Sequence, residues 1–271
     1  DDIPFPNNNN SLNARFRKSA MVGILTGRGC PFNCSFCYEG ANAKNVRFRS
    51  IESVMEEIDY IIENNPNLNL INVYDDTFTL DINRVYKFCD EIVKRNVFWV
   101  CEGHISNIIK YPEMLDYMVK SNLIGLQIGI ESGSDKVLKA YNKHTTSADI
   151  LKTVKICKKA GLSSLTGNFI IGGALEDYET FNDSLELAKK MIECGRGMFE
   201  CRTVFLAPYP HTKISKNPEN YGLHLDENLI EHTIYTMHNP VMSTDTLSIE
   251  EISALRDKFN VEIENKYLEE T

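Results

Sequence analysis

Several features that mark special classes of protein are missing from this sequence. No apolar run is long enough to cross a bilayer as a helix, and the first residues lack the basic and apolar segments of a secretory signal peptide. Basic residues do not outnumber acidic ones, because the formal net charge is -9. Such a balance gives no support to nucleic-acid binding. We therefore expect a cytoplasmic protein with no membrane and no nucleic acid as partner.

An initiator methionine is missing too, since the chain begins Asp1-Asp2-Ile3. This start is compatible with a fragment that was excised or processed from a longer protein. The composition itself is ordinary: 42% of the 271 residues are hydrophobic and 25% are charged, as in typical globular proteins. A chain of this length can bury a substantial core. We therefore expect one large main domain.

A disulfide framework is not expected, although the chain holds eight cysteines. Its size and the lack of a signal peptide favour a reducing compartment. Cys89, Cys101 and Cys157 lie in apolar patterns and are predicted to be buried, inert thiols. Cys194 and Cys201 have no close cysteine partner, so a second metal site there is the less favoured interpretation.

The remaining cysteines, Cys30, Cys34 and Cys37, share one short segment that follows the apolar run 21–26. Soft thiolates bind zinc, copper(I) or iron–sulfur clusters. A structural zinc site usually takes four ligands, whereas this segment supplies three, with no histidine beside them at ligand spacing. Three thiolates on a 4Fe–4S cluster leave one iron without a protein ligand, and that iron can chelate a substrate or cofactor. The spacing favours a cluster, with structural cysteines and a zinc module as alternatives.

Strand-like and helix-like segments alternate along most of the chain. Six apolar runs have the length of strands, at 21–26, 69–74, 97–101, 124–130, 165–171 and 199–206. Between them, helical periodicity predicts helices with N-caps at Ser50, Asp81 and Ser147 and a glycine stop at Gly161. Strands that are apolar throughout and alternate with helices predict an α/β fold with a parallel sheet covered by helices, and right-handed crossovers would curl it into a partial, open TIM-like (β/α)6 barrel. We expect a lead-in over residues 1–18, a core over 19–212 and a C-terminal helical extension over 213–271.

Polar or glycine-rich clusters follow these strands at their carboxyl ends, the edge that carries the active site in βα barrels. The predicted clusters are Asp75-Asp76-Thr77, Glu102-Gly103-His104, Glu131-Ser132-Gly133, Gly172-Gly173 and Ala207-Pro208-Tyr209-Pro210-His211. A simpler interpretation exists for some of them, because glycines serve turns and aspartates cap helices. Their common position nevertheless predicts one site at that edge.

The spacing Cys30-x3-Cys34-x2-Cys37, with Phe36 just before the last cysteine, resembles the signature of the radical S-adenosylmethionine superfamily. The resemblance extends from about Ser19 to Pro210. It implies an enzyme in which a 4Fe–4S cluster binds S-adenosylmethionine through its open iron. Reductive cleavage then gives a 5′-deoxyadenosyl radical that abstracts hydrogen from a substrate. A reducing partner such as flavodoxin or ferredoxin is implied as well.

The resemblance also implies roles for individual residues. Those expected to contact S-adenosylmethionine are Phe36 near the adenine, Asp75, Asp76 and Thr77 at the methionine amine, Glu131 and Ser132 at the ribose and methionine part, and Gly172 near the adenine. The segment after Gly172 resembles Gly-x-Pro-Gly-Glu, but Ala174 and Leu175 replace the Pro and the second Gly. Backbone details at the adenine are therefore less defined by the resemblance.

No catalytic residue is assigned from the sequence. His104 and His211 are candidates for an acid or base that faces the substrate, and the alternative for each is a rim histidine satisfied within the fold. Tyr38 and Tyr209 are candidate substrate contacts, and Arg28 and Arg202 are candidate carboxylate partners.

Within the superfamily, residues 129–146 resemble the branch shared by methylthiotransferases and cobalamin-associated enzymes. The resemblance implies C-methylation or rearrangement of a small-molecule or peptide substrate, with cobalamin bound by an upstream domain. No Asp-x-His-x-x-Gly cobalamin motif occurs in the sequence, so that domain is expected outside this chain. The alternatives are a barrel-only enzyme without methyl transfer and a non-catalytic iron–sulfur electron carrier.

Overall fold

Six parallel strands form one open sheet in the computed structural model, which describes residues 19–226, 229 and 237–270. The strands are β1 (Met21–Ile24), β4 (Leu70–Val73), β5 (Phe98–Gly103), β6 (Leu123–Glu131), β7 (Ser164–Ile171) and β8 (Phe199–Phe205), in that spatial order. Within these residues β1 and β8 are edge strands that do not pair with each other. The predicted partial (β/α)6 barrel is confirmed, whereas the predicted lead-in 1–18 lies outside the described residues.

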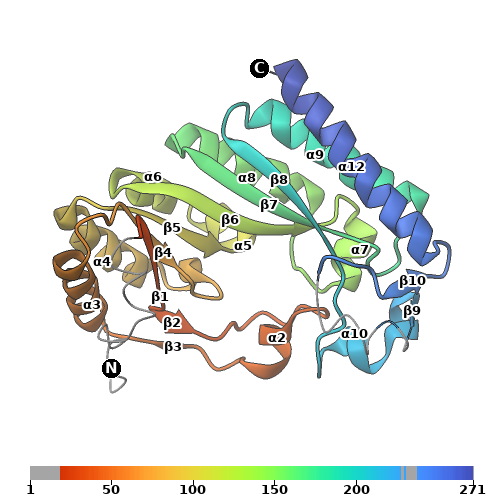
Figure 1. Ribbon diagram of the computed structural model, residues 1–271, viewed down its shortest axis with the longest axis horizontal. Helices are drawn as coiled ribbons and strands as arrows, with labels where there is room; N and C mark the ends of the chain where they lie inside the picture. The colour runs from red at the N-terminus through yellow and green to blue at the C-terminus, as the bar shows by residue number, and fades with distance from the viewer. Residues whose placement is uncertain (1–18, 227–228, 230–236, 271) are drawn as a thin grey trace.

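Helices cover one side of this sheet, and their ends follow local chemistry (Figure 1). They are α3 (Ile51–Asn64), α4 (Ile82–Ile92), α5 (Ile105–Lys110), α6 (Glu113–Lys120), α7 (Asp135–Ala140), α8 (Ser147–Ala160), α9 (Tyr178–Cys194) and α12 (Ile249–Glu270). The predicted caps Ser50 and Asp81 accept hydrogen bonds from backbone amides at the starts of α3 and α4. The cap predicted at Ser147 is wrong, because Thr146 caps α8 in a capping box with Asp149.

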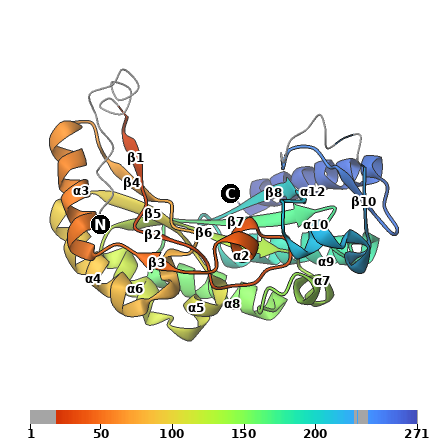
Figure 2. The same ribbon diagram turned by 90° about the horizontal axis from the view of Figure 1, so that it is seen from below.

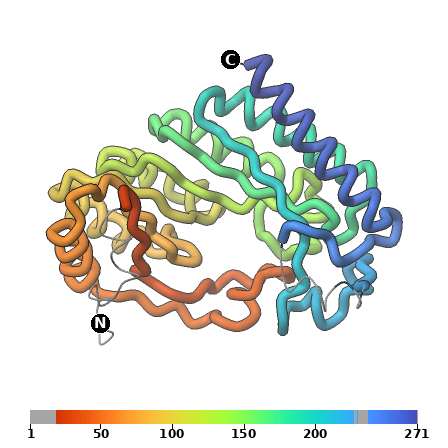
Figure 3. The backbone as a smooth tube through the Cα atoms, viewed as in Figure 1, coloured from red at the N-terminus to blue at the C-terminus, as the bar shows by residue number. Residues whose placement is uncertain are grey.

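Short elements complete the chain. They are β2 (Gly27–Arg28), α2 (Tyr38–Asn42), β3 (Arg47–Phe48), α10 (Lys213–Lys216), β9 (Leu223–Leu225), β10 (Met242–Thr244) and three 3₁₀ turns, η1 (Phe78–Leu80), η2 (Val93–Arg95) and η3 (Pro218–Tyr221). In Figure 2 the segment with β2, α2 and β3 crosses in front of the sheet, at the end of the molecule that faces the viewer. It reaches from the β1 side of the molecule to the α10 side and returns (Figure 3). None of the helices in the described ranges is both long and apolar enough to span a membrane.

The main core lies between the sheet and the helices. Burial alternates along β1 and β5, so that Trp99 and Cys101 are buried while Phe98 and Glu102 on the other face are exposed. The strands were predicted to be apolar on both faces. The alternation arises because helices cover only one face in the described chain. The predicted extension joins this core through α12, whose Phe259 packs against Phe169 and Phe181.

Candidate active site

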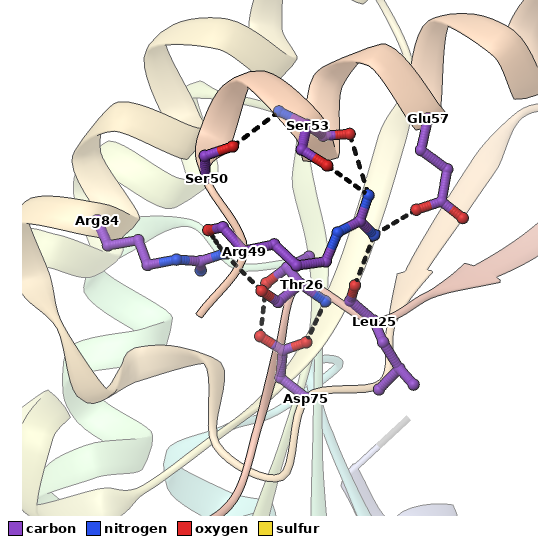
Figure 4. A network of polar contacts seen from close by, with 8 residues as sticks. All are labelled: Leu25, Thr26, Arg49, Ser50, Ser53, Glu57, Asp75 and Arg84. Atoms are coloured by element: carbon purple, nitrogen blue, oxygen red, sulfur yellow. Dashed lines mark hydrogen bonds and ion pairs between the residues drawn. The ribbon is translucent and has the colours of Figure 1, made fainter. Parts of the chain in front are cut away.

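The cysteine segment, residues 27–37, is fixed at its N-terminal end by Asp75, which lies just after β4. Both carboxylate oxygens accept hydrogen bonds from Thr26, one from its amide at 2.6 Å and one from its hydroxyl at 2.5 Å (Figure 4). Nη2 of Arg84 donates a hydrogen bond to the carbonyl oxygen of Thr26 at 2.9 Å. Burial raises the pKa of the Asp75 carboxyl, and the hydrogen bonds and the Arg84 charge oppose this shift. Asp75 therefore bonds within the protein, where it anchors the chain as it leaves β1.

A second layer of contacts surrounds this anchor. Arg49 donates to the carbonyl of Leu25 at 2.9 Å and forms an ion pair with Glu57 on α3. It also donates to the carbonyl and hydroxyl oxygens of Ser53 (Figure 4). These bonds tie the segment between β1 and the cysteines to the start of α3, so several polar contacts fix the chain where the cysteine segment begins.

Asp76 and Thr77 contact the segment next to the first cysteine. Oδ2 of Asp76 accepts from the amide of Gly29 at 2.6 Å, and the hydroxyl of Thr77 lies 3.6 Å from Sγ of Cys30. Gly29 has φ +92°, and a Cβ there would lie 2.5 Å from the carbonyl oxygen of Asn45, so only glycine fits. The ends of β1 and β4 are therefore joined directly in front of Cys30.

The three cysteines are free thiols on this segment, with Cys30 buried and Cys34 and Cys37 partly buried. Burial raises the pKa of Cys34 to about 11 and raises that of Cys37; Cys37 and Cys30 add to the shift of Cys34, and Cys30 adds to that of Cys37. Lys143 opposes the shift for both residues. The thiols are thus close enough to interact, and a bound metal would keep them as thiolates.

These donors fit a cluster better than a single ion. In the part of the chain that the structure describes, no three His, Cys, Asp or Glu side chains are arranged to hold one metal ion. An iron–sulfur cluster presents several irons, so its thiolates need not converge on one point. The soft donor set and its spread along one segment therefore suit a 4Fe–4S cluster.

The other end of the cysteine segment is bound to the end of α7. The amide of Ser35 donates to the carbonyl of Tyr141 at 3.0 Å, and Nδ2 of Asn142 donates to the carbonyl of Asn33 at 3.0 Å. The ring of Phe36 meets that of Tyr141 edge to face, with 4.9 Å between centroids. These contacts hold the segment between Cys34 and Cys37 over the carboxyl end of β6 and the helix that follows.

A buried ion pair lies beneath Cys34. Nζ of Lys143 lies 2.6 Å from Oε1 of Glu131, and both side chains are less than a tenth exposed. Glu131 has φ +65° at a register shift between β6 and β7. A Cβ on Gly129 would lie 2.1 Å from the Glu131 carboxylate and 2.6 Å from Nζ, so glycine leaves room for the pair. Burial lowers the pKa of Lys143, but Glu131 and Cys34 outweigh it and the net shift is upward.

Ser132 bonds toward α9. Its hydroxyl lies 3.1 Å from the hydroxyl of Ser184 and accepts from the amide of Ser134 at 3.1 Å. The amide of Gly133 donates to Ser184 at 2.9 Å, and a Cβ at Gly133 would lie 2.3 Å from the carbonyl oxygen of Asp183. Ser132 is buried and links the turn after β6 to the neighbouring helix.

The turn after β7 is built around Glu176. This buried carboxylate accepts hydrogen bonds from the amides of Gly172 and Gly173, while burial raises its pKa to about 7. Gly172 has φ +75°, and the amide of Ala174 donates to the hydroxyl of Tyr141 at 3.1 Å. Tyr141 thus contacts both the cysteine segment and the β7 turn, which brings two separate predicted regions together.

The two candidate histidines differ in environment. His104 is buried at the start of α5, and its ring is stacked on Phe32 of the cysteine segment at a centroid distance of 3.7 Å. His211 is exposed after β8 at φ +67°. Of the other candidates, Tyr38 and Tyr209 contact each other edge to face, and Arg202 pairs with Glu200. The structure therefore brings His104, but not His211, into buried contact with the segment.

Lys143 and Phe32 were not predicted as site residues, and Glu102 was predicted only as part of the cluster after the third strand. Lys143 follows Glu131 by twelve residues in an irregular stretch, where no local pattern marks it as a partner. Glu102 is exposed by surface area and accepts from Gln127 at 3.1 Å, and the partial loss of solvation there, together with the negative charges of Asp76 and Glu131, raises its pKa. Its side chain lies on the exposed face of β5.

An open arch of six parallel βα units, with a three-cysteine segment at the carboxyl ends of its strands, defines the class of TIM-like partial-barrel enzymes. A family model described as the radical SAM superfamily, where SAM is S-adenosylmethionine, matches residues 24–188. This match covers more than half of the chain. The chain belongs to the radical S-adenosylmethionine superfamily and is an enzyme of that superfamily.

Individual relatives agree with the predicted branch. The chain is 29% identical to an uncharacterized methyltransferase of Pyrococcus horikoshii over 95% of this chain and 55% of that protein. It is 27% identical to the anaerobic magnesium-protoporphyrin IX monomethyl ester cyclase of Rubrivivax gelatinosus over 60% of this chain and 29% of that protein. The chain thus spans about half, or less, of the length of these relatives.

Among solved structures, the chain is similar to a cobalamin-dependent S-adenosylmethionine radical enzyme, OxsB, that was solved with aqua-cobalamin and S-adenosylmethionine bound. The TM-score is 0.71 at 16% identity, and the alignment covers 90% of this chain and 41% of OxsB. At this identity the similarity concerns the fold alone.

Proposed function

We propose that this chain is the radical-generating part of a larger enzyme that methylates or rearranges its substrate together with cobalamin. The observation that carries the proposal is the placement of Cys30, Cys34 and Cys37 on one braced segment at the carboxyl ends of β1 and β4. When bound, a 4Fe–4S cluster on these thiols supplies the electron that cleaves S-adenosylmethionine to a 5′-deoxyadenosyl radical, which takes hydrogen from the substrate.

The residues around the segment divide into two groups in this proposal. Asp75 and Ser132 position the segment and the β6 turn, because their side chains bond to Thr26 and Ser184 and so hold neighbouring elements together. Asp76, Thr77 and Glu131 face the cysteines or the ion pair beside them, so we assign them to the methionine end of S-adenosylmethionine.

Two further predicted contacts of S-adenosylmethionine come from two different loops. Phe36 lies on the cysteine segment, against Tyr141, and Gly172 lies in the turn held by Glu176. Phe36 packs against Tyr141, and the turn that contains Gly172 bonds to the hydroxyl of Tyr141 through the amide of Ala174. We therefore assign both residues to the adenine end. His104 and His211 are not assigned to proton transfer.

Cobalamin and methyl transfer are supported by the relatives rather than by residues of this chain. One relative is named a methyltransferase, and the similar solved structure is named cobalamin-dependent. Because the chain spans 55% of the Pyrococcus methyltransferase, we assign cobalamin to a further, upstream domain of the whole protein. Residues 1–18 would act as the lead-in from that domain. Residues 19–212 would form the radical core and residues 213–271 an extension. The partners would be a reductant such as flavodoxin or ferredoxin and a small-molecule or peptide substrate.

The second candidate is hydrogen abstraction without methyl transfer. It is favoured by the relative named as a cyclase and by the lack of an Asp-x-His-x-x-Gly motif among these residues. A non-catalytic electron carrier is less supported, because a carrier needs no buried Glu131–Lys143 pair beside its cluster.

One experiment separates these functions. The chain is reconstituted with iron and sulfide without oxygen and incubated with S-adenosylmethionine and dithionite, beside Cys34→Ala and, as a control, Cys157→Ala in the core. We expect 5′-deoxyadenosine from the wild type and the control and none from Cys34→Ala. S-adenosylhomocysteine, formed when the full-length protein is given hydroxocobalamin and reductant with S-adenosylmethionine, would identify methyl transfer, because it is the product left when the methyl group moves from S-adenosylmethionine to reduced cobalamin. A wild-type chain that binds cluster but forms no 5′-deoxyadenosine would contradict the proposal.

A further inference from the structure

The tautomer of His104 is determined by the start of α5. Nδ1 of His104 accepts a hydrogen bond from the amide of Ser106 at 3.2 Å and lies 2.7 Å from the hydroxyl of Ser106. A nitrogen that accepts from a backbone amide carries no proton, so the proton of a neutral ring is on Nε2. Burial, with the positive charges of Lys143 and His144, lowers the pKa of this imidazole to about 3. His104 is therefore a neutral ring with one N–H group.

That N–H group has no acceptor among the described residues. Nε2 of His104 is buried and makes no hydrogen bond there, and the whole residue is only 7% exposed. A buried donor without a partner costs about 1–3 kcal/mol, and most such groups in native proteins are satisfied. The position therefore calls for an acceptor that a bound group would supply.

The stack with Phe32 restricts the direction of the N–H bond. The ring planes of Phe32 and His104 differ by 11° at a centroid distance of 3.7 Å. An imidazole N–H bond lies in the plane of its ring, so it runs alongside Phe32 and not into it. Phe32 lies between Cys30 and Cys34 in the chain. The donor is therefore held next to the part of the segment that carries two of the three thiols.

The charges around the imidazole favour a negative acceptor. Lys143 and His144 act on His104, and Lys143 also acts on Cys34 and Cys37. The same lysine thus faces both the imidazole and the thiols. Thiolate and sulfide sulfurs of a cluster are negative and accept hydrogen bonds from outer residues.

We propose that His104 is a positioning residue whose Nε2–H donates a hydrogen bond to a sulfur of the cluster held by Cys30, Cys34 and Cys37. The inference rests on the proposed cluster. Such a bond stabilises the reduced, more negative cluster and so raises its reduction potential. The ring stack fixes the donor, and Ser106 fixes the tautomer.

The test measures the midpoint potential of the reconstituted chain by EPR-monitored titration. His104→Phe keeps a ring to stack on Phe32 but removes the donor, whereas His104→Gln restores an amide N–H. We expect the Phe variant to lose at least tenfold in the equilibrium constant of one-electron reduction, which is a shift of 59 mV toward negative potential. The Gln variant should recover most of this shift. His224→Phe on β9, whose histidine pairs with Asp245, should leave the potential unchanged.

A second measurement covers the case in which the Phe variant takes up no cluster. Pulsed EPR of the reduced wild-type chain with 15N-labelled histidine should show a nitrogen coupled to the cluster, and His104→Gln should remove that signal. Equal potentials in wild type and His104→Phe, or no histidine coupling in the wild type, would overturn the inference. In either case 5′-deoxyadenosine from the wild type would leave the proposed function intact, whereas failure of the wild type to bind a cluster would reject both.

Discussion

Lys143 and Glu131 form an ion pair of 2.6 Å inside the protein, twelve residues apart in the chain and next to Cys34. Removing one partner of a buried pair leaves an uncompensated charge and costs about 3–5 kcal/mol of unfolding free energy. We expect this loss for Lys143→Met and a similar loss for Glu131→Gln, measured by urea denaturation. The double variant Lys143→Met with Glu131→Leu should be more stable than Lys143→Met alone.

The matched control for that pair is Lys189→Met. Lys189 pairs with Glu262 at 3.0 Å on the surface, where ion pairs contribute little. The control should therefore leave stability nearly unchanged. Equal losses for Lys143→Met and Lys189→Met would show that the buried pair has no special role.

Gly129→Ala tests whether the Glu131–Lys143 ion pair needs the space that glycine leaves at position 129. A Cβ 2.1 Å from the Glu131 carboxylate must displace that side chain or Lys143. Overpacking of this kind costs about 1–3 kcal/mol, so we expect lower stability and at least a several-fold weaker affinity for S-adenosylmethionine by equilibrium dialysis. Gln127→Ala on the same strand adds no atoms and should keep that affinity. Unchanged affinity in Gly129→Ala would separate Glu131 from the cofactor.

Asp75 and Asp76 are adjacent but should respond differently to substitution. Asp75 is buried with two hydrogen bonds from Thr26, whereas Asp76 is only partly buried and has one from Gly29. Hydrogen bonds to a charged group contribute about 1.5–3 kcal/mol. We expect Asp75→Ala to lower the free energy of unfolding by about 3 kcal/mol or more. Asp76→Ala should lose less stability but more affinity for S-adenosylmethionine, and the reverse order would refute the division of roles.

Glu176 should make stability depend on pH. Its pKa is about 7 in the folded protein, against an ordinary value of 4.5. Between these values the folded state binds the proton more tightly than the unfolded state, so stability falls as pH rises from about 4.5 to about 7 and is then constant. The shift corresponds to at most about 3 kcal/mol.

The Glu176 effect is measured by thermal unfolding across this pH range. Glu176→Gln should remove this part of the dependence, because glutamine does not titrate. Thermal unfolding profiles of the same slope in both proteins would mean that Glu176 is ionised at low pH in the native state.

Local sequence predicted much of the fold. The six apolar runs became β1 and β4 to β8 because each is rich in β-branched or aromatic residues and is bounded by polar or glycine residues. Ser50, Asp81 and Gly161 ended or began helices as predicted, since capping depends on neighbouring amides. Thr146 rather than Ser147 capped α8, because Asp149 completes a capping box from that position.

The arrangement at the site required long-range contacts. No local pattern joins Lys143 to Glu131, which pair across α7, or His104 to Phe32, which meet only when the end of β5 lies beside the cysteine segment. Asp75 and Asp76 are neighbours with the same chemistry, yet one is buried against Thr26 and the other faces Gly29. Only the backbone direction at the end of β4 separates them.

The sequence by itself determined the family, the three thiols and the parallel βα order, because these depend on residue type, spacing and periodicity within short segments. The tertiary structure decided which carboxylates bond within the protein and that Lys143 lies near the thiols. It also decided that the N–H group of His104 has no partner among the described residues. Those properties depend on burial and on partners far apart in sequence, and burial is created only when the strands and the cysteine segment come together.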